Sequence, residues 1–213
     1  MKRDPYKNSV KFYDTFIGPA TIVLRKIVLK MNLPKKGMRV LEVGCGTGLN
    51  LKLYQEAECK IHGIDLSPSM VNAASKKLDE KADIRVGDAS LMPYQDNSFD
   101  LVVAMFTLHE MPGSIRLPVI NEMARVMKMD GHLLLVDFHP GPVRFPKGWL
   151  YKVVIFFIEM SAGREHFRNY RNFIANKGLP PLIETNNLHI EKKKIVGNGN
   201  LALFLVSEAY QNR

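Results

Sequence analysis

Val40-Leu41-Glu42-Val43-Gly44-Cys45-Gly46-Thr47-Gly48 is the most informative stretch of this chain. It begins within the apolar run 39–43, which predicts a buried β-strand. The three glycines that follow allow a sharp turn and let a ligand approach the bare backbone. The glycine spacing differs from the Gly-x-Gly-x-x-Gly loop of dinucleotide folds, and no Gly-Lys-Ser/Thr of a phosphate loop follows. The stretch therefore predicts a strand that ends in a ligand-binding turn of another kind.

Short apolar runs alternate with helix-like stretches over the next part of the chain. Ser67 and Pro68 are typical of an N-cap and a first helical residue, and we expect that helix to reach about Leu78. A second helix is expected over about 114–127. This alternation predicts right-handed βαβ crossovers and an open, mostly parallel α/β sheet. Further strands are expected at 60–65, 84–86, 99–105 and 133–137.

The last part of the chain has a different pattern. Residues 189–196 and 201–206 flank Gly197-Asn198-Gly199-Asn200, and Asn-Gly is a strong hairpin signal. We therefore expect the sheet to end in an antiparallel hairpin.

Two segments lie outside the expected core. Residues 1–34 carry several aromatic side chains and an amphipathic helix with Ile22, Val23, Ile27 and Met31 at helical spacing. Residues 140–182 contain an apolar helix (149–160) and a basic helix (about 164–177) that ends at Gly178. We expect one domain over 1–213, made of N-terminal cap helices (1–34), a ligand-binding core (35–139), a helical lid (140–182) and a hairpin (183–213).

Composition sets the broad class of the protein. The chain has 213 residues, 46 % of them hydrophobic, which excludes a disordered or fibrous chain. The net charge of +9 favours anionic partners without choosing among them. Cys45 and Cys59 are too few for a disulfide framework and fit no zinc pattern, so we expect no metal and a reducing compartment. No apolar run follows Met1, so we expect no signal peptide and a cytoplasmic protein.

Acidic residues follow the second and third expected strands. Asp65 can accept hydrogen bonds from both hydroxyls of a ribose. Asp88 can accept one from an adenine amino group, or it can serve as a helix cap. No basic group is present here for a pyrophosphate, so a positively charged ligand with ribose and adenine fits better than NAD.

Over roughly residues 36–138, these motifs resemble those of the class I S-adenosylmethionine-dependent methyltransferases. The residues that carry the resemblance are Glu42 to Gly48, Gly63-Ile64-Asp65-Leu66-Ser67, Gly87-Asp88-Ala89, Phe99-Asp100-Leu101-Val102 and Gly131-His132-Leu133-Leu134. The resemblance implies a Rossmann-like, doubly wound sheet of seven strands and S-adenosylmethionine as cofactor. It places Gly44 and Gly46 at the methionine part, Asp65 at the ribose and Asp88 near the adenine. The cofactor-binding residues expected on this basis are Glu42, Gly44, Cys45, Gly46, Gly48, Asp65, Leu66, Asp88, Ala89 and Ala104.

The N-terminal segment adds a second resemblance. Tyr13-Asp14, followed by Phe16 and Gly18, resembles the start of the subfamily that methylates quinone precursors and phospholipid head groups. In that subfamily the Tyr helps to enclose the methyl-transfer site. A general base is needed only if the acceptor arrives protonated. We expect Tyr13, His109 and His139 as catalytic candidates, although each can also be a satisfied structural residue.

The sequence leaves the methyl acceptor open. We favour a small or lipid-like amphipathic acceptor, with peripheral membrane contact through the apolar helix 149–160 and nearby Lys147 and Lys152. The alternatives are an RNA methyltransferase, suggested by the net charge of +9, and a non-catalytic nucleoside-binding regulatory domain. Nucleic acid is the less favoured partner, because the chain has neither an Asn/Asp-Pro-Pro-aromatic tetrapeptide nor a Pro-Cys pair. The oligomeric state stays open.

Overall fold

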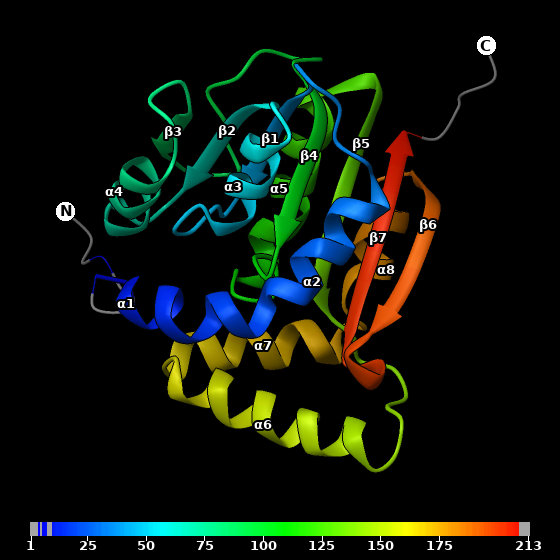
Figure 1. Ribbon diagram of the computed structural model, residues 1–213. Coiled ribbons are helices and arrows are strands. Elements are labelled where there is room, and N and C mark those ends of the chain that lie inside the picture. Colours follow the sequence, from blue (N-terminus) through cyan, green and yellow to red (C-terminus); the bar gives the residue numbers. More distant parts are fainter. Residues whose placement is uncertain (1–3, 5, 8–9, 209–213) are drawn as a thin grey trace.

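A seven-stranded sheet forms the centre of the computed structural model, which describes residues 4, 6–7 and 10–208 (Figure 1). The strand order is β3-β2-β1-β4-β5-β7-β6. β7 pairs antiparallel with both β5 and β6, and the other pairings are parallel. The strands are β1 (Arg39–Val43), β2 (Lys60–Asp65), β3 (Asp83–Val86), β4 (Phe99–Met105), β5 (Met127–Phe138), β6 (Leu188–Val196) and β7 (Leu201–Glu208). The expected parallel sheet with a terminal antiparallel hairpin is confirmed.

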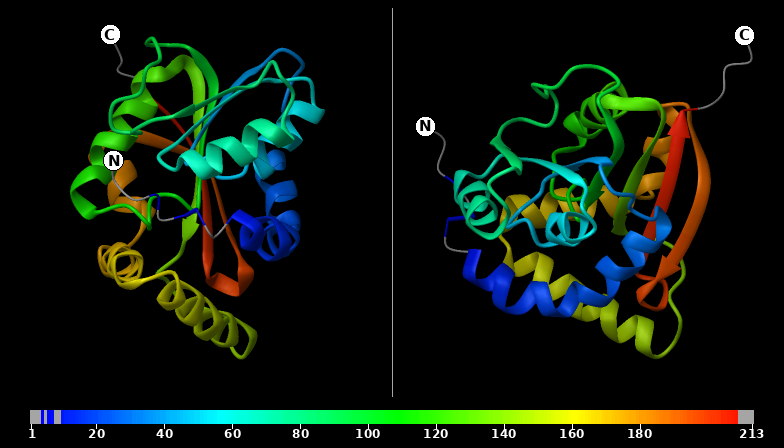
Figure 2. Two further views of the ribbon diagram at one scale, coloured as in Figure 1. Left: turned by 90° about the vertical axis from the view of Figure 1, so that its left-hand side faces the viewer. Right: turned by 45° about the horizontal axis from the view of Figure 1, so that its top comes forward.

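Helices cover both faces of the sheet and the edge where the parallel strands end (Figures 1 and 2). One face carries α2 (Gly18–Met31), α3 (Leu49–Glu56) and α4 (Pro68–Lys77). The other face carries α5 (Gly113–Val126) and α8 (Leu179–Thr185). The remaining helical segments are α1 (Val10–Phe12), the π-helical turn η1 (Tyr13–Ile17), α6 (Lys147–Ser161), α7 (Arg164–Ala175) and the 3-10 turn η2 (Gly197–Gly199). The first four of these lie at the carboxyl edge, where ligands bind in open parallel sheets.

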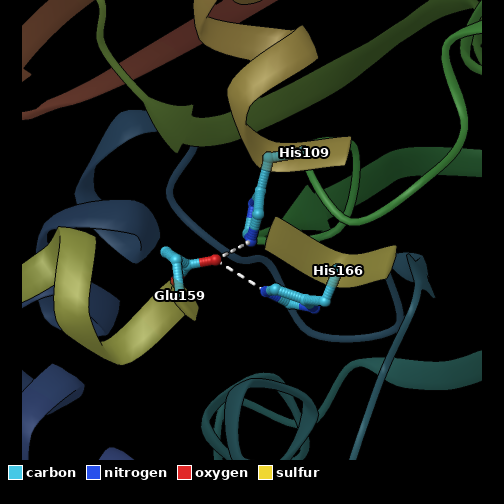
Figure 3. Close-up of side chains that lie close together, drawn as sticks. All are labelled: His109, Glu159 and His166. Atoms are coloured by element: carbon cyan, nitrogen blue, oxygen red, sulfur yellow. Dashed lines mark hydrogen bonds and ion pairs between the residues drawn. The ribbon is translucent and has the colours of Figure 1, made fainter. Parts of the chain in front are cut away.

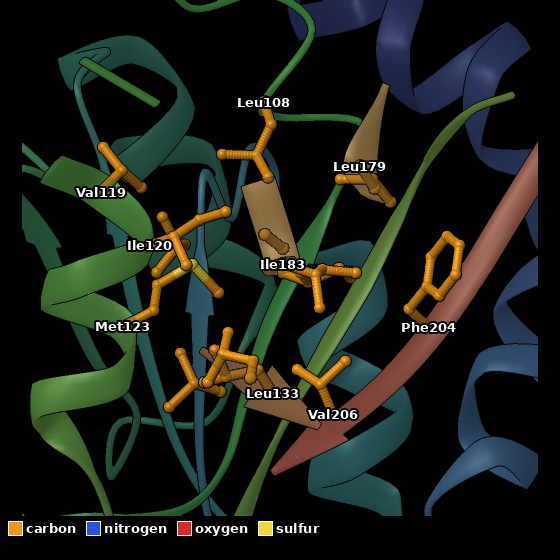
Figure 4. Close-up of a cluster of buried hydrophobic side chains, with 14 of the residues drawn as sticks. Leu108, Val119, Ile120, Met123, Leu133, Leu179, Ile183, Phe204 and Val206 are labelled. Atoms are coloured by element: carbon orange, nitrogen blue, oxygen red, sulfur yellow. The ribbon is translucent and has the colours of Figure 1, made fainter. Parts of the chain in front are cut away.

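The hydrophobic core has two halves because consecutive side chains of a strand point to opposite faces. On the α5 face, Ile120 and Met123 belong to one buried cluster with sheet residues that include Leu133 and Phe204 (Figure 4). On the opposite face, Leu24 and Val28 of α2 belong to a second buried cluster with sheet residues such as Val40 and Leu134. Every apolar residue of β4 is buried, as its nearly continuous apolar run predicts.

One expected boundary is wrong. β5 begins at Met127 rather than at Leu133, directly after α5 ends at Val126, and Met127 already pairs with Phe99 of β4. A register irregularity between Phe99 and Leu101 accommodates the extra residues of β5. The short helix α8 was not expected from the sequence.

The expected apolar face of the N-terminal helix is also wrong in part. Ile22 and Val23 of α2 are exposed, whereas Leu24, Val28 and Met31 are buried against the sheet. The helix also buries Arg25, whose guanidinium donates hydrogen bonds to the Gly18 carbonyl and to Thr21 Oγ1. The buried side of this helix therefore includes a charged residue. A search for evenly spaced apolar residues does not find a buried side of this kind.

Within the part of the chain that the structure describes, no helix has both the length and the apolar character needed to cross a membrane.

Candidate functional site

The glycine-rich turn after β1 has the open backbone that its sequence predicts. Gly44, Gly46 and Gly48 all have positive φ, at 67°, 52° and 75°. A Cβ atom on Gly44 would collide with Thr107, whereas one on Gly46 would meet no atom within 4 Å. Gly44 is therefore required by packing, and the space above Gly46 is free for a ligand.

Asp65 ties this turn to the end of β2. Its Oδ2 accepts a hydrogen bond from the Gly46 N–H at 2.8 Å, and its Oδ1 accepts one from the Ser67 N–H at 2.9 Å. Burial raises the pKa of this carboxyl, and the two N–H donors act in the opposite direction. Each carboxylate oxygen has a second acceptor position, so Asp65 keeps the capacity to bind ribose hydroxyls.

Glu42, at the end of β1, is a buried acid with unused hydrogen-bonding capacity. Its Oε1 accepts a hydrogen bond from Asn50 Nδ2 at 3.1 Å, whereas its buried Oε2 has no partner among the described residues. Burial raises the pKa of Glu42 to about 8, despite the nearby positive charge of Arg25. An unpartnered buried carboxylate oxygen suits a cationic ligand group such as the ammonium of a methionine moiety.

The N-terminal segment crosses this region. Asp14 Oδ1 accepts hydrogen bonds from Thr47 Oγ1 and Lys77 Nζ, both at 2.6 Å. Asp4 Oδ1 accepts one from Ser67 Oγ at 2.8 Å. These contacts fasten the first part of the chain over the turns that follow β1 and β2.

Two tyrosines of the same segment converge on Glu110, which lies beyond the end of β4. Tyr6 Oη donates to Glu110 Oε2 at 2.5 Å, and Tyr13 Oη lies 3.5 Å from Glu110 Oε1. Burial, followed by the charge of Glu110, raises the pKa of both tyrosines, so they remain neutral. The N-terminal segment and the β4 loop thus form one polar wall.

His109 stands beside this wall in a cluster of buried charged groups (Figure 3). Its Nδ1 lies 2.7 Å from Asp137 Oδ1, and its Nε2 lies 3.4 Å from Glu159 Oε2. The same Glu159 oxygen lies 2.6 Å from His166 Nε2. Burial lowers the pKa of His109, but Asp137 and Glu159 outweigh it and raise that pKa. Burial raises the pKa of Glu159, but the two histidines outweigh it and lower that pKa.

Three of the other expected residues have ordinary structural surroundings. Cys45 is buried, and its N–H donates to the Ile64 carbonyl at 3.2 Å. Asp88 is exposed and accepts hydrogen bonds from the N–H and Oγ of Ser90, which is a local cap. Among the described residues, His139 makes no hydrogen bond to those of the polar wall. Its Nδ1 instead donates to the Gly199 carbonyl at 3.0 Å.

The remaining expected positions lie along the carboxyl edge. Leu66 follows β2 and is 74 % exposed, which makes it available to an apolar ligand group. Ala104 is buried in β4 beside Val43, and Ala89 packs partly against the core after β3. None of these contacts assigns a role by itself, and the roles stay predictions.

Three functional candidates were not selected from the sequence: Tyr6, Glu159 and His166. Glu159 carried a usable signal, because it is the one acid in the apolar run 149–160 and an isolated buried charge needs a partner. His166 gives no such signal, because it lies between Arg164 and Arg168 in the basic helix 164–177, a pattern typical of a solvated surface.

Comparisons with known proteins show which proteins this chain resembles. A family described as a methyltransferase domain matches residues 41–135. A phosphatidylethanolamine N-methyltransferase of Cereibacter sphaeroides is 40 % identical over 48 % of this chain and 51 % of its own length. A demethylmenaquinone methyltransferase of Bacillus licheniformis is 33 % identical over 76 % of this chain and 75 % of its own length. The chain spans about half the length of the first curated relatives that it matches.

The fold has solved counterparts as well. A structure described as a SAM-dependent methyltransferase from Aquifex aeolicus has a TM-score of 0.67 and 22 % identity, and the match covers 96 % of this chain and 98 % of that chain. At this identity the match supports the fold alone.

Proposed function

Since this chain belongs to the class I S-adenosylmethionine-dependent methyltransferases, we propose that it transfers a methyl group from that cofactor to a small or lipid-like amphipathic acceptor. The two relatives described above are named for phosphatidylethanolamine and demethylmenaquinone. Both names refer to a lipid as the molecule that is methylated, so they support an acceptor drawn from a membrane.

The described residues suit two distinctive groups of the cofactor, its ammonium group and its ribose hydroxyls. The free space above Gly46 accommodates a ligand against the backbone. The unpartnered Oε2 of Glu42 suits the ammonium group, and Asp65 suits the ribose hydroxyls. When bound, the cofactor supplies an activated methyl group, so the protein mainly has to align the acceptor and exclude water.

We assign this work to Tyr6, Tyr13 and Glu110. They come from the N-terminal segment and the β4 loop, and both tyrosine hydroxyls contact the Glu110 carboxyl. We assign Tyr13 and Glu110 to holding the acceptor, and Tyr6 to fixing the orientation of the Glu110 carboxyl. His109 is buried behind Glu110, its Nε2 4.0 Å from Glu110 Oε1, and we assign it to the same wall.

The acceptor class is inferred mainly from helix α6, which exposes apolar side chains and buries a charged one. The only buried residues of this helix are Gly148 and Glu159, and its large apolar side chains are exposed except for Ile155, which is half-buried against the core. The exposed ones are Trp149, Leu150, Tyr151, Val153, Val154, Phe156, Phe157, Ile158 and Met160, at 42–62 % exposure. We name these nine residues the α6 apolar face. An exposed apolar surface of this extent is typical of an interaction site.

Basic residues lie at the start of α6 and on the neighbouring helix α7. Arg144 and Lys147 precede it, and Lys152 lies over the Trp149 ring at 5.9 Å. On α7, Arg164, Arg168 and Arg171 line a shallow pocket of about 370 Å³. Apolar side chains flanked by cations are suited to the interface of an anionic bilayer, where the apolar groups enter the acyl boundary and the cations meet phosphates. We therefore assign the bilayer surface as the source of the acceptor.

The test is to incubate the protein with radiolabelled S-adenosylmethionine and separated lipid and RNA fractions. We expect label in the lipid fraction. Label in RNA would favour the alternative acceptor, and label in neither fraction would favour a non-catalytic nucleoside-binding domain. Calorimetry with S-adenosylhomocysteine and with NAD checks the cofactor separately, and we expect binding of the first only.

A further inference from the structure

His109, Glu159 and His166 bring three potential metal ligands together from three parts of the chain. His109 follows β4, Glu159 lies near the end of α6, and His166 lies in the first turns of α7. One ligand atom from each lies within 4.8 Å of the others, and all three side chains are largely buried (Figure 3). We propose that these residues bind a divalent cation of the zinc class, which fastens α6 and α7 to the loop after β4.

The distances fit such an ion. Zinc binds His nitrogen and carboxylate oxygen at about 2.0–2.2 Å, so tetrahedral neighbours lie roughly 3.3–3.5 Å apart. His109 Nε2 and Glu159 Oε2 are 3.4 Å apart. His166 Nε2 is 2.6 Å from the same oxygen, so it has to retreat by less than about 1 Å to admit the ion.

Asp137 gives His109 the support that metal-binding histidines typically have. Its Oδ1 accepts a hydrogen bond from His109 Nδ1 at 2.7 Å, and its Oδ2 accepts one from the His109 backbone N–H at 3.2 Å. This carboxylate fixes the ring and leaves Nε2 directed at Glu159. A carboxylate–histidine–metal arrangement orients the ligand and raises its basicity.

Charge balance supports a cation at this place. Asp137 and Glu159 are buried, and Glu110 lies within 4.0 Å of His109. The Nε2 atoms of both histidines face the same Glu159 oxygen. A divalent ion between them would offset the negative charge of two of the carboxylates. Three protein ligands leave a further coordination position for water or for an oxygen of the acceptor.

The cluster also explains why an apolar helix contains a buried acid. Glu159 is the only charged side chain that α6 buries, and its carboxylate oxygen meets both histidines. The proposed ion would therefore hold α6 with its apolar face outward. The site does not depend on methyl transfer, and its test measures metal binding alone.

The experiment is a calorimetric titration of chelator-treated protein with zinc chloride, followed by X-ray absorption at the zinc edge. We expect one zinc per chain, with nitrogen and oxygen ligands at about 2.0–2.2 Å. Glu159→Gln and His166→Ala should abolish stoichiometric binding. Asp137→Asn should weaken zinc affinity about 10–100-fold, since it removes the support of His109.

The chain provides a matched control in His132, whose Nε2 lies 3.1 Å from Glu191 Oε2 on the surface of the sheet. His132→Ala removes a histidine from another His–Glu pair and should leave zinc binding unchanged. Circular dichroism checks that each variant is folded. If a variant is not folded, His166→Gln is measured in its place and should also lose zinc binding. The proposal is overturned if the wild type binds no zinc, or if Glu159→Gln and His166 variants bind zinc as tightly as the wild type.

Discussion

α5 and α6 have nearly the same length, 14 and 15 residues, but they expose opposite kinds of side chain. α5 buries Val119, Ile120, Met123 and Val126 against the sheet. α6 turns its apolar face to solvent and buries Glu159. α5 therefore contributes to the free energy of folding through hydrophobic burial, whereas α6 presents a surface that folding alone does not require.

The same contrast extends over the molecule. Buried apolar residues fill the two faces of the sheet, and buried polar residues gather at its carboxyl edge, among them Glu42, His109 and Asp137. Substitutions in the first group should reduce stability and leave ligand affinity unchanged. Substitutions at the carboxyl edge should change ligand affinity more than stability.

The largest expected effect is on α5. Ile120→Ala removes a fully buried side chain and should lower the free energy of unfolding by about 2–5 kcal/mol. Urea denaturation measures this change. A loss below about 0.5 kcal/mol, typical of surface sites, would show that α5 is not the core helix described here.

The second prediction concerns cofactor affinity. Asp65→Ala should weaken binding of S-adenosylhomocysteine by about 2–4 kcal/mol, because hydrogen bonds to a charged acceptor are lost. Asp65→Asn keeps the shape and should weaken binding less, and calorimetry measures both. As a control, the exposed cap Asp88→Asn should have the smallest effect. Equal affinity of wild type and Asp65→Ala would place the ribose elsewhere.

The third prediction uses the buried acid Glu42. Burial raises its pKa to about 8 in the folded protein, whereas an unfolded Glu ionises near 4.5. Between pH 6 and 8 the folded state therefore binds more protons than the unfolded state, and stability falls as pH rises. The loss across this window should be about 2 kcal/mol for the ligand-free protein.

Glu42→Gln should remove this part of the pH dependence, which urea denaturation at both pH values measures. An unchanged slope in the variant would show that Glu42 is already ionised in the folded protein.

The smallest expected effect on stability lies on the α6 apolar face. Phe157→Ser replaces a side chain that is 56 % exposed, so it should change the free energy of unfolding by no more than about 0.5 kcal/mol. Thermal and urea unfolding of Phe157→Ser and of Ile120→Ala, measured together, compare the stability contributions of α6 and α5 directly. A large loss of stability would mean that Phe157 is packed in solution.

The sequence predicted the elements whose signals are local. The apolar runs 39–43, 60–65 and 99–105 became β1, β2 and β4 with the expected boundaries. Ser67 caps α4 as expected, its Oγ accepting a hydrogen bond from the Met70 N–H. These features depend on short-range patterns, so a single sequence contains them.

The parts that were missed depend on tertiary contacts. The buried stripe of α2 includes Arg25, which is held by oxygens of its own helix, so the apolar pattern pointed to the wrong face. In the candidate site, His109 was found from its position after β4, whereas Glu159 and His166 come from α6 and α7. Only the packing of these helices against the β4 loop brings the three together.

The most direct measurement of the membrane assignment uses the single tryptophan of the chain, Trp149, which is 57 % exposed on the α6 apolar face. Its fluorescence emission is recorded while vesicles containing an anionic phospholipid are added. Burial of this face in the bilayer interface predicts a shift of the emission to shorter wavelength, reduced in Phe157→Ser and weakened by salt. Emission that stays unchanged at saturating vesicle concentration would contradict the account.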